Sequence, residues 1–283
     1  MEIRQALTAA CSALALERLD AQLLLLHALG RPQNDRAWLL AHDTDTLDPE
    51  TEARYISLTR RRAAGTPLAY LTGVREFYGL PLQVDARVLD PRPDTETLVD
   101  WALACIASIP TPRVIDLGTG SGAIALALKH ARPDARVAAL DASADALAVA
   151  QANAQALRLD VAFQHGHWLD SVTDTYHLIV SNPPYIADND PHLERLGHEP
   201  RMALTSGPDG LDAIRAIVAQ APERLVSGGW LLLEHGWDQA AAVRDILGRA
   251  GFVQVQSRRD LADIERCSGG CWPGPDPDAA KGS

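Results

Sequence analysis

The residues best suited to chemistry in this chain are Asn182-Pro183-Pro184-Tyr185. They follow the short apolar run from Tyr176 to Ser181, which has the length and branched side chains of a buried strand, so we expect them at its carboxyl end. The two prolines stiffen the chain and leave backbone carbonyl groups free to accept hydrogen bonds. Asn182 adds a side-chain acceptor and Tyr185 adds a flat aromatic face. This corner predicts a site for a planar NH2 group, either an amide or the exocyclic amine of a base.

A second candidate group lies upstream, in a pattern of strand, turn, helix and strand. The turn is Asp116-Leu117-Gly118-Thr119-Gly120-Ser121-Gly122-Ala123, whose glycines let a ligand lie against bare backbone. Asp141 ends the next expected strand, where a carboxylate can accept both ribose hydroxyls of an adenosine. This spacing does not separate a nicotinamide dinucleotide from another adenosine-containing cofactor.

The two groups together favour S-adenosylmethionine, with S-adenosylhomocysteine as the product. Hydride transfer has no use for the tetrapeptide, whereas methyl transfer to a planar nitrogen does. An amide or aryl nitrogen is a poor nucleophile, so the enzyme must hold both N–H groups and direct the lone pair at the methyl group. Asn182 and the Pro183 carbonyl are suited to this. We therefore expect in-line transfer, catalysed mainly by orientation, without a strong general base and without a metal.

Three segments are expected to position these residues. Residues 1–73 have helical spacing and predict a small bundle for substrate recognition, and residues 74–90 predict a β-hairpin that links two domains. From residue 91 to 283, alternating strands and helices predict a Rossmann-like, doubly wound α/β domain with a mostly parallel sheet. In it, Asp94 is expected to cap a helix, and residues from about 269 to 283, rich in Gly, Pro and Asp, to form a loose tail.

Composition restricts the class of protein. The 283 residues carry a net charge of −11, which argues against broad attraction to nucleic acid. There is no apolar run long enough to span a membrane, and the first residues do not have the layout of a secretory signal. Four scattered cysteines, of which Cys267 and Cys271 do not have zinc-site spacing, agree with a reducing compartment. We expect a cytoplasmic monomer.

Several stretches match the motifs of one known family: Pro67 to Gly73, Glu76 to Leu80, Pro91 to Glu96, Asp116 to Gly122, Asn182 to Tyr185, Glu199-Pro200 with Ala203-Leu204, and Leu232 to Gly236. Through them the chain resembles the N5-glutamine methyltransferases of peptide chain release factors, the HemK/PrmC family, over nearly its whole length to about Arg266. The resemblance implies that the protein methylates the glutamine of the Gly-Gly-Gln motif in class-1 release factors, and thus acts in translation termination.

The resemblance also implies roles for single residues. Gly118 to Gly122 would hold the methionine end of the cofactor, Asp141 its ribose, and Trp168 would lie along its adenine. Asn182 would touch both cofactor and glutamine, and Pro183, Pro184 and Tyr185 would complete the glutamine site. The family usually has an acidic residue immediately before this Trp, where this chain has His167.

Three other functions fit part of the pattern. A glutamine methyltransferase of a ribosomal protein would share the chemistry, but Pro91 to Glu96 resembles the release-factor branch. An N6-adenine DNA methyltransferase would need base flipping and a basic face, and neither a target-recognition insert nor positive charge is visible. A non-catalytic cofactor-binding partner of a translation factor would not need Asn182.

Overall fold

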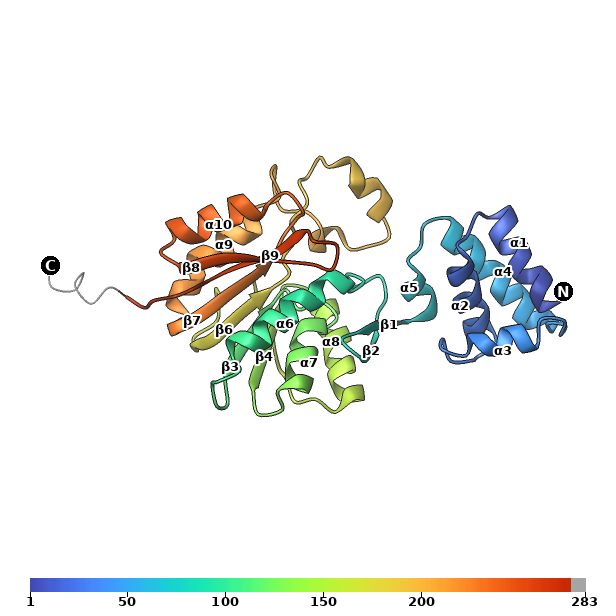
Figure 1. Ribbon diagram of the computed structural model, residues 1–283, viewed down its shortest axis with the longest axis horizontal. Helices are drawn as coiled ribbons and strands as arrows, with labels where there is room; N and C mark the ends of the chain where they lie inside the picture. The colour runs from blue at the N-terminus through green and yellow to red at the C-terminus, as the bar shows by residue number, and fades with distance from the viewer. Residues whose placement is uncertain (276–283) are drawn as a thin grey trace, which may run out of the picture. The chain divides into compact units, whose positions relative to one another are not determined.

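Short helices make up the first unit of the chain, Met1–Val74 (Figure 1). They are α1 (Ile3–Ala13), α2 (Arg18–Ala28), α3 (Arg36–Ala41), α4 (Pro49–Ala63) and α5 (Leu68–Thr72). The helix α2 packs against each of the others. This explains why the consecutive residues Leu24, Leu25 and Leu26 are all buried although they point to different sides of the helix. The Asp48 carboxylate caps α4 by accepting two backbone N–H bonds, as the Asp-Pro pair predicts.

The second unit begins at Arg75, and the structure describes the chain as far as residue 275, apart from the side chain of Arg195. Its described part contains a 7-stranded sheet with the order β5-β4-β3-β6-β7-β9-β8. The strands are β3 (Arg113–Leu117), β4 (Arg136–Asp141), β5 (Ala162–His165), β6 (Tyr176–Ser181), β7 (Leu225–Glu234), β8 (Val253–Arg259) and β9 (Glu265–Cys271). All pairs are parallel except those of β9, which runs antiparallel to both neighbours. The predicted doubly wound, mostly parallel sheet is confirmed.

Helices cover both faces of this sheet (Figure 1). On one face lie α6 (Glu96–Cys105), α7 (Ala123–Ala131) and α8 (Ala144–Leu157), and on the other lie α9 (Asp212–Gln220) and α10 (Ala240–Arg249). Side chains alternate between the two cores along each strand. In β7, Leu232 packs on the side of α6, whereas Leu231 and Leu233 pack on the side of α9 and α10.

The hairpin of β1 (Val74–Phe77) and β2 (Leu80–Gln83) is packed into the second unit. Phe77, Leu80 and Leu82 are buried in the core that contains α6 and α7. Asn153 on α8 holds the backbone of Gln83 by accepting from its N–H and donating to its carbonyl group. The segment that the sequence suggests as a linker thus has a fixed place against the sheet domain.

The sheet reverses its strand order between β3 and β6, because the chain moves outward from β3 to β4 and β5 and then returns to the other side of β3. Loops at the carboxyl ends of these two strands diverge, which opens a crevice in sheets of this kind. The glycine-rich turn follows β3 and the Asn182 tetrapeptide follows β6. The topology therefore brings the two sequence motifs to the same place.

The prediction that a loose tail begins at about residue 269 is wrong for its first residues. Strand β9 continues to Cys271, and its Gly269 and Gly270 lie between β7 and β8. A Cβ atom on Gly269 would stand 2.5 Å from Leu232 Cδ2, and one on Gly270 would stand 2.8 Å from Phe252 Cβ. Glycine is needed here for close packing, not for a turn. Residues 276–283 lie outside the described part of the chain.

The expected cap by Asp94 is also wrong. Asp94 lies inside a short 3-10 turn, Pro93–Thr95, and no side chain caps the first turn of α6. Its carboxylate instead lies 3.6 Å from Nε of Arg266.

Two further 3-10 turns, Pro191–Leu196 and Arg201–Ala203, lie in the long connection between β6 and α9, and a fourth, Ala221–Glu223, follows α9. No helix in the described part of the chain is long and apolar enough to cross a membrane.

Candidate active site

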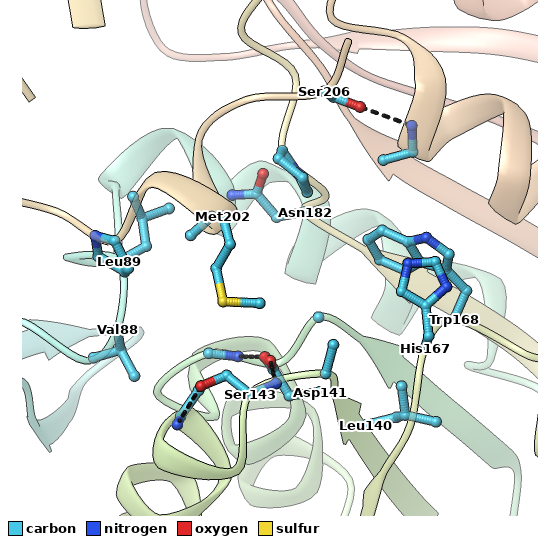
Figure 2. Close-up of a pocket in the computed structure, with 18 of the residues that line it drawn as sticks. Val88, Leu89, Leu140, Asp141, Ser143, His167, Trp168, Asn182, Met202 and Ser206 are labelled. Carbon is cyan, nitrogen blue, oxygen red and sulfur yellow. Dashed lines mark hydrogen bonds between the residues drawn. The ribbon is translucent and has the colours of Figure 1, made fainter. Parts of the chain in front are cut away.

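A cavity of about 460 Å³ opens at the carboxyl ends of the parallel strands (Figure 2). Its lining includes Gly118 and Gly120 after β3, Asp141 at the end of β4, Trp168 after β5 and Asn182 after β6. The volume is within the usual range for sites that enclose a ligand of cofactor size. The cavity thus joins candidate residues that lie up to 64 positions apart in the sequence.

The glycines of the turn after β3 have two different tasks. Gly118 and Gly120 line the cavity with positive φ angles of 69° and 55°, where a side chain would be strained. Gly122 lies away from the cavity lining, and a Cβ there would stand 3.0 Å from Leu126 Cδ1 and 3.3 Å from Ala150 Cβ. It lets α7 start close to α8.

Thr119 and Ser121, both expected in the cofactor site, are buried and are not among the residues that line the cavity. The Thr119 hydroxyl donates a 2.6 Å hydrogen bond to the Asp116 carboxyl group, and the Ser121 carbonyl accepts from Asn153 Nδ2 at 2.9 Å. These side chains and carbonyl groups shape the turn. Burial raises the pKa of Asp116 to about 7.

Asp141 is anchored by the loop around it. One carboxylate oxygen accepts a 2.8 Å hydrogen bond from the Gly120 N–H group, and the other accepts from the Ser143 N–H group at 2.8 Å (Figure 2). A carboxylate offers about four lone-pair positions, so acceptor capacity remains on the side that faces the cavity. The residues present fit an adenosine ribose at this end.

Trp168 lines the cavity and also packs against the core on the side of α9. Its φ angle is 44°, which is rare for a bulky residue and marks a local constraint. The next residue fixes the backbone, since Leu169 is buried and its N–H donates to the Gln220 side chain at 2.8 Å. His167 lies beside the Trp168 ring at the cavity wall, with Nδ1 3.6 Å from an Asp170 carboxylate oxygen.

Asn182 lies where two cavities meet. A smaller cavity of about 180 Å³ is lined by Leu89, Arg92, Asn182, Tyr185, Ile186, Leu196, Ala203 and Leu204. Of these, Leu89, Asn182 and Ala203 also line the larger cavity. The Asn182 amide donates from Nδ2 to the Thr95 hydroxyl at 3.3 Å. Its Oδ1 atom is thereby left to serve as an acceptor.

The other members of the tetrapeptide divide between the cavities. Pro184 lines the larger one and Tyr185 the smaller one, whereas Pro183 is buried and is not among the lining residues of either. Burial, together with the nearby Glu234 carboxyl group, raises the pKa of the Tyr185 hydroxyl. The Tyr185 carbonyl accepts a 3.0 Å hydrogen bond from Gln239 Nε2. The tyrosine therefore stays protonated and is held in place from its backbone.

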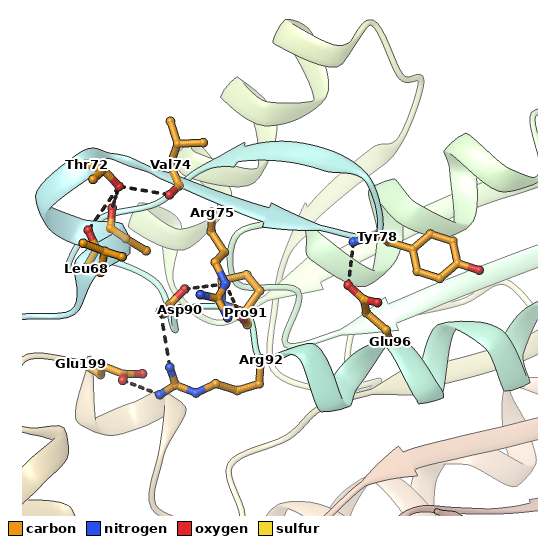
Figure 3. Close-up of polar contacts among 11 residues, drawn as sticks. Leu68, Thr72, Val74, Arg75, Tyr78, Asp90, Pro91, Arg92, Glu96 and Glu199 are labelled. Atoms are coloured by element: carbon orange, nitrogen blue, oxygen red, sulfur yellow. Dashed lines mark hydrogen bonds and ion pairs between the residues drawn. The ribbon is translucent and has the colours of Figure 1, made fainter. Parts of the chain in front are cut away.

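A charge network of two buried carboxylates and two half-buried arginines, to which sequence reasoning gave no role, includes Arg92 of the smaller cavity (Figure 3). Arg92 donates a 2.5 Å hydrogen bond to Glu199 and lies 3.5 Å from Asp90, which in turn lies 3.4 Å from Arg75. Burial would lower the pKa of Arg92, but Glu199 and Asp90 outweigh it and raise the value. The Pro-Arg-Pro segment and the Glu199-Pro200 match were the available signals.

Glu234, at the end of β7, is a further polar residue without a predicted role. It is 2% exposed, and its Oε2 atom has no hydrogen-bond partner among the described residues. Burial raises its pKa to about 7, against the effects of hydrogen bonds from Thr95 and Asn182 and of the charge of Arg266. Two features of the sequence point to Glu234. It lies in the matched stretch from Leu232 to Gly236, and because side chains alternate along a strand, it shares with Leu232 the face of the sheet that α6 covers.

The chain is similar to known proteins over most of its length. Residues 99–256 match the family model of the methyltransferase small domain, and residues 2–73 match the PrmC N-terminal domain. A release factor glutamine methyltransferase from Bordetella pertussis is 53% identical over 90% of this chain and 95% of its own length. One from Escherichia coli K12 is 45% identical over 88% of this chain and 90% of its own length.

A solved structure shares the fold. It is a T. thermophilus 16S rRNA N2 G1207 methyltransferase in complex with AdoMet and guanosine, with a TM-score of 0.53 and 19% identity over 71% of this chain and 50% of that chain. Identity at this level supports the fold alone. On the strength of the close relatives and of both family models, the chain belongs to the family of release factor glutamine methyltransferases, as its motifs predict.

Proposed function

We propose that this protein transfers the methyl group of S-adenosylmethionine to the side-chain amide nitrogen of a glutamine in a peptide chain release factor. The observation that carries the proposal is that Asn182 lines both cavities. Methyl transfer requires donor and acceptor in line and in contact, and a residue shared by both cavities can hold one against the other.

The larger cavity suits the cofactor. Asp141 would accept the ribose hydroxyls, the backbone at Gly118 and Gly120 would lie along the methionine end, and the Trp168 ring would cover the adenine. S-adenosylmethionine supplies an electrophilic methyl group on a sulfonium. His167 takes the place of the acidic residue common in the family, and its imidazole faces the same cavity as Trp168.

The smaller cavity suits the glutamine. Its lining is largely aliphatic, with Leu89, Ile186 and Leu196 among its members, and can pack the methylene stem of the side chain. At its polar end Asn182 Oδ1 would accept one amide N–H. The resemblance assigns the other N–H to the Pro183 carbonyl, although Pro183 is buried and is not among the lining residues of either cavity. Tyr185 would cover the plane of the amide.

The chemistry asked of these residues is orientation. The amide lone pair is delocalised, so two acceptors that fix both N–H bonds also fix the direction in which the nitrogen can attack. The same acceptors stabilise positive charge as it develops on nitrogen. The proton to be lost becomes acidic after the attack, and the protonated Tyr185 does not serve as a strong base.

Further features of the reaction are part of the proposal. The enzyme would act as a monomer. The net charge of −11 fits a protein substrate better than a nucleic acid, and four free cysteines fit the cytoplasm. The substrate would be the Gly-Gly-Gln loop of a class-1 release factor, recognised with the help of residues 1–73.

The test is transfer of a labelled methyl group from S-adenosylmethionine to a purified class-1 release factor. We expect label on the glutamine of the Gly-Gly-Gln motif and none on a release factor in which this glutamine is replaced by alanine. Ribosomal proteins and DNA serve as competing acceptors in parallel reactions. Label on either of these, with none on the release factor, would contradict the proposed function.

A further inference from the structure

The Glu234 side chain is a buried carboxyl group with an incomplete set of partners. It is 2% exposed, and its Oε2 atom is unpaired among the described residues. Burying such a group costs stability that an apolar side chain would not cost. Its position is set by the alternation of β7, which puts it on the same face as Leu232, below the start of α6.

Two side chains of the candidate active site lower the pKa of this carboxyl group by hydrogen bonding, Thr95 from the turn before α6 and Asn182 from the loop after β6. Thr95 also accepts a 3.3 Å hydrogen bond from Asn182 Nδ2. The Asn182 Nδ2 atom thus binds Thr95, and the Glu234 carboxyl group interacts with both side chains. These contacts join α6, β6 and β7 directly behind the residue that both cavities share.

We propose that the Glu234 carboxylate is a positioning group for methyl transfer, which holds the Asn182 amide with Nδ2 turned inward and Oδ1 turned toward the acceptor nitrogen. The inference rests on the proposed function, in which Asn182 Oδ1 accepts an N–H of the substrate amide.

The physical reason is the difference between the two ends of an amide. An ionised carboxylate accepts hydrogen bonds and cannot donate them, so it binds Nδ2 and repels Oδ1. If the Asn182 amide were flipped, its Oδ1 atom would face an oxygen of the Glu234 carboxylate. Its Nδ2 group, a donor, would then face the N–H groups of the substrate, which are also donors. A hydroxyl such as that of Thr95 can donate or accept, so it does not enforce one orientation by itself.

Protonation of Glu234 would remove this preference, because a carboxylic acid can also donate. The ionisable groups that face Glu234 are Arg266 and Cys267 on β9, Asp94 before α6 and Tyr185 after β6. Burial raises the Glu234 pKa to about 7, Arg266 lowers it and Asp94 raises it. The orienting carboxylate is therefore the form present above about pH 7.

The test compares Glu234→Gln, Glu234→Ala and a control, Glu265→Gln. Glu265 is a carboxylate on the neighbouring strand β9 that pairs with Arg244 at 3.2 Å and lies outside both cavity linings. We expect Glu234→Ala to lower kcat with the release factor by roughly 100-fold, as for one lost oriented group. The KM for the release factor and the Kd for S-adenosylmethionine should stay near those of the unmodified protein, the Tm should not fall, and Glu265→Gln should change none of these.

Glu234→Gln separates positioning from mere packing. It keeps the shape and one acceptor oxygen, so kcat should recover to a value between those of Glu234→Ala and the unmodified protein. In the unmodified protein and in Glu265→Gln, kcat should rise with pH through about 7, and in Glu234→Gln this rise should be absent. If Glu234→Ala does not fold, Thr95→Val and Thr95→Ser are compared instead. Serine keeps the hydroxyl group that binds Asn182 and valine removes it, so kcat should fall in Thr95→Val alone.

Two outcomes contradict the positioning role while the proposed function stands. In the first, kcat is unchanged in both Glu234→Ala and Glu234→Gln, and the pH dependence of kcat in Glu234→Gln is that of the unmodified protein. The other is a loss of kcat matched by weaker S-adenosylmethionine binding or by a lower Tm. Failure of the unmodified protein to methylate the release factor would instead overturn the proposed function.

Discussion

The Asn182 side chain differs from the other polar groups of the site because it reaches both cavities. Asp141 faces the larger cavity, and Arg92 faces the smaller one. A substitution at either of these should affect one ligand, whereas a substitution at Asn182 should affect the reaction between the two. Residue-scale experiments can therefore separate binding from transfer.

Asn182→Ala should fold and bind S-adenosylmethionine nearly as well as the unmodified protein, because Asp141 and the glycine-rich turn remain. Transfer should slow by roughly 10²–10³, which is about 3 to 4 kcal/mol of barrier, since one oriented acceptor is lost. Calorimetry with S-adenosylmethionine and single-turnover labelling of the release factor measure the two effects. Asn189→Ala, at an exposed position of the same connection, is the control and should behave as the unmodified protein does. Equal activity of the two variants would remove Asn182 from its proposed role.

Asp141→Asn should have the opposite profile. The asparagine can keep at most one of the two backbone bonds through its oxygen and loses the charge that favours ribose hydroxyls. We expect the Kd for S-adenosylmethionine to rise about tenfold or more, with transfer at saturating cofactor much less affected. A titration with S-adenosylmethionine, followed by a rate measurement at saturation, distinguishes this from a loss of folding.

At the scale of the elements, one glutamine side chain ties together several points of the connection between β6 and α9. Gln239, at the start of α10, donates to the carbonyl groups of Tyr185 and Asp209 and accepts from the Gly236 N–H group. Gly210 lies directly against the Tyr185 carbonyl, where a Cβ atom would collide with it. The backbone of the tetrapeptide is therefore positioned by residues far along the chain.

Gly210→Ala tests this contact. The new methyl group must displace the Tyr185 carbonyl or the Gln239 amide, and its φ of 75° adds strain. We expect a lower Tm and a loss of transfer of at least tenfold. The control is Gly248→Ala in helix α10, where a Cβ meets nothing within 4 Å and should stabilise the helix by about 0.5–1 kcal/mol. Thermal unfolding of both variants checks the sign of each change.

The strands differ in how well the sequence predicts them, and the reason is physical. β3, β4 and β6 are short apolar runs bounded by turns, so pattern alone places them. β9 reads Glu-Arg-Cys-Ser-Gly-Gly-Cys, which lacks branched side chains and suggests a breaker. Its glycines are required by neighbours on β7 and β8 that only the folded sheet brings near. The pairing of Arg92 with Glu199 and the surroundings of Glu234 were missed for the same reason, since these partners are distant in sequence.

For the molecule as a whole, two buried carboxyl groups link stability to pH. Asp116 and Glu234 both have pKa values raised to about 7 by burial, from ordinary values of 3.8 and 4.5. Between about pH 4 and 7 the folded state holds these protons while the unfolded state has released them. The free energy of unfolding should therefore decrease as pH rises through this window and level off above it, as far as these two groups contribute.

Asp116→Asn should flatten this dependence. The asparagine oxygen can still accept from Thr119 and from the Ala125 N–H group, and there is no proton to lose. Relative to the unmodified protein, the variant should gain stability as pH rises from about 4 to 7 and keep that gain above pH 7, on the order of 1.4 kcal/mol per unit of pKa shift removed. Urea unfolding at several pH values measures it. Asp134→Asn is the control. Arg132 lowers the pKa of the exposed Asp134 to about 2, so its effect on the free energy of unfolding would change with pH only below the range tested here. A dependence as steep in Asp116→Asn as in the unmodified protein would contradict this assignment.

The order of the strands in the sheet has a consequence for biosynthesis. β9 lies between β7 and β8 but follows both in the chain, so it emerges from the ribosome after its two neighbours. Until then β7 has an unpaired edge, and Arg266, which approaches both Asp94 and Asp260, is not in place. A nascent chain of this protein can assemble its helical unit and its glycine-rich turn early, but the surroundings of Glu234 are completed only when the last strand inserts.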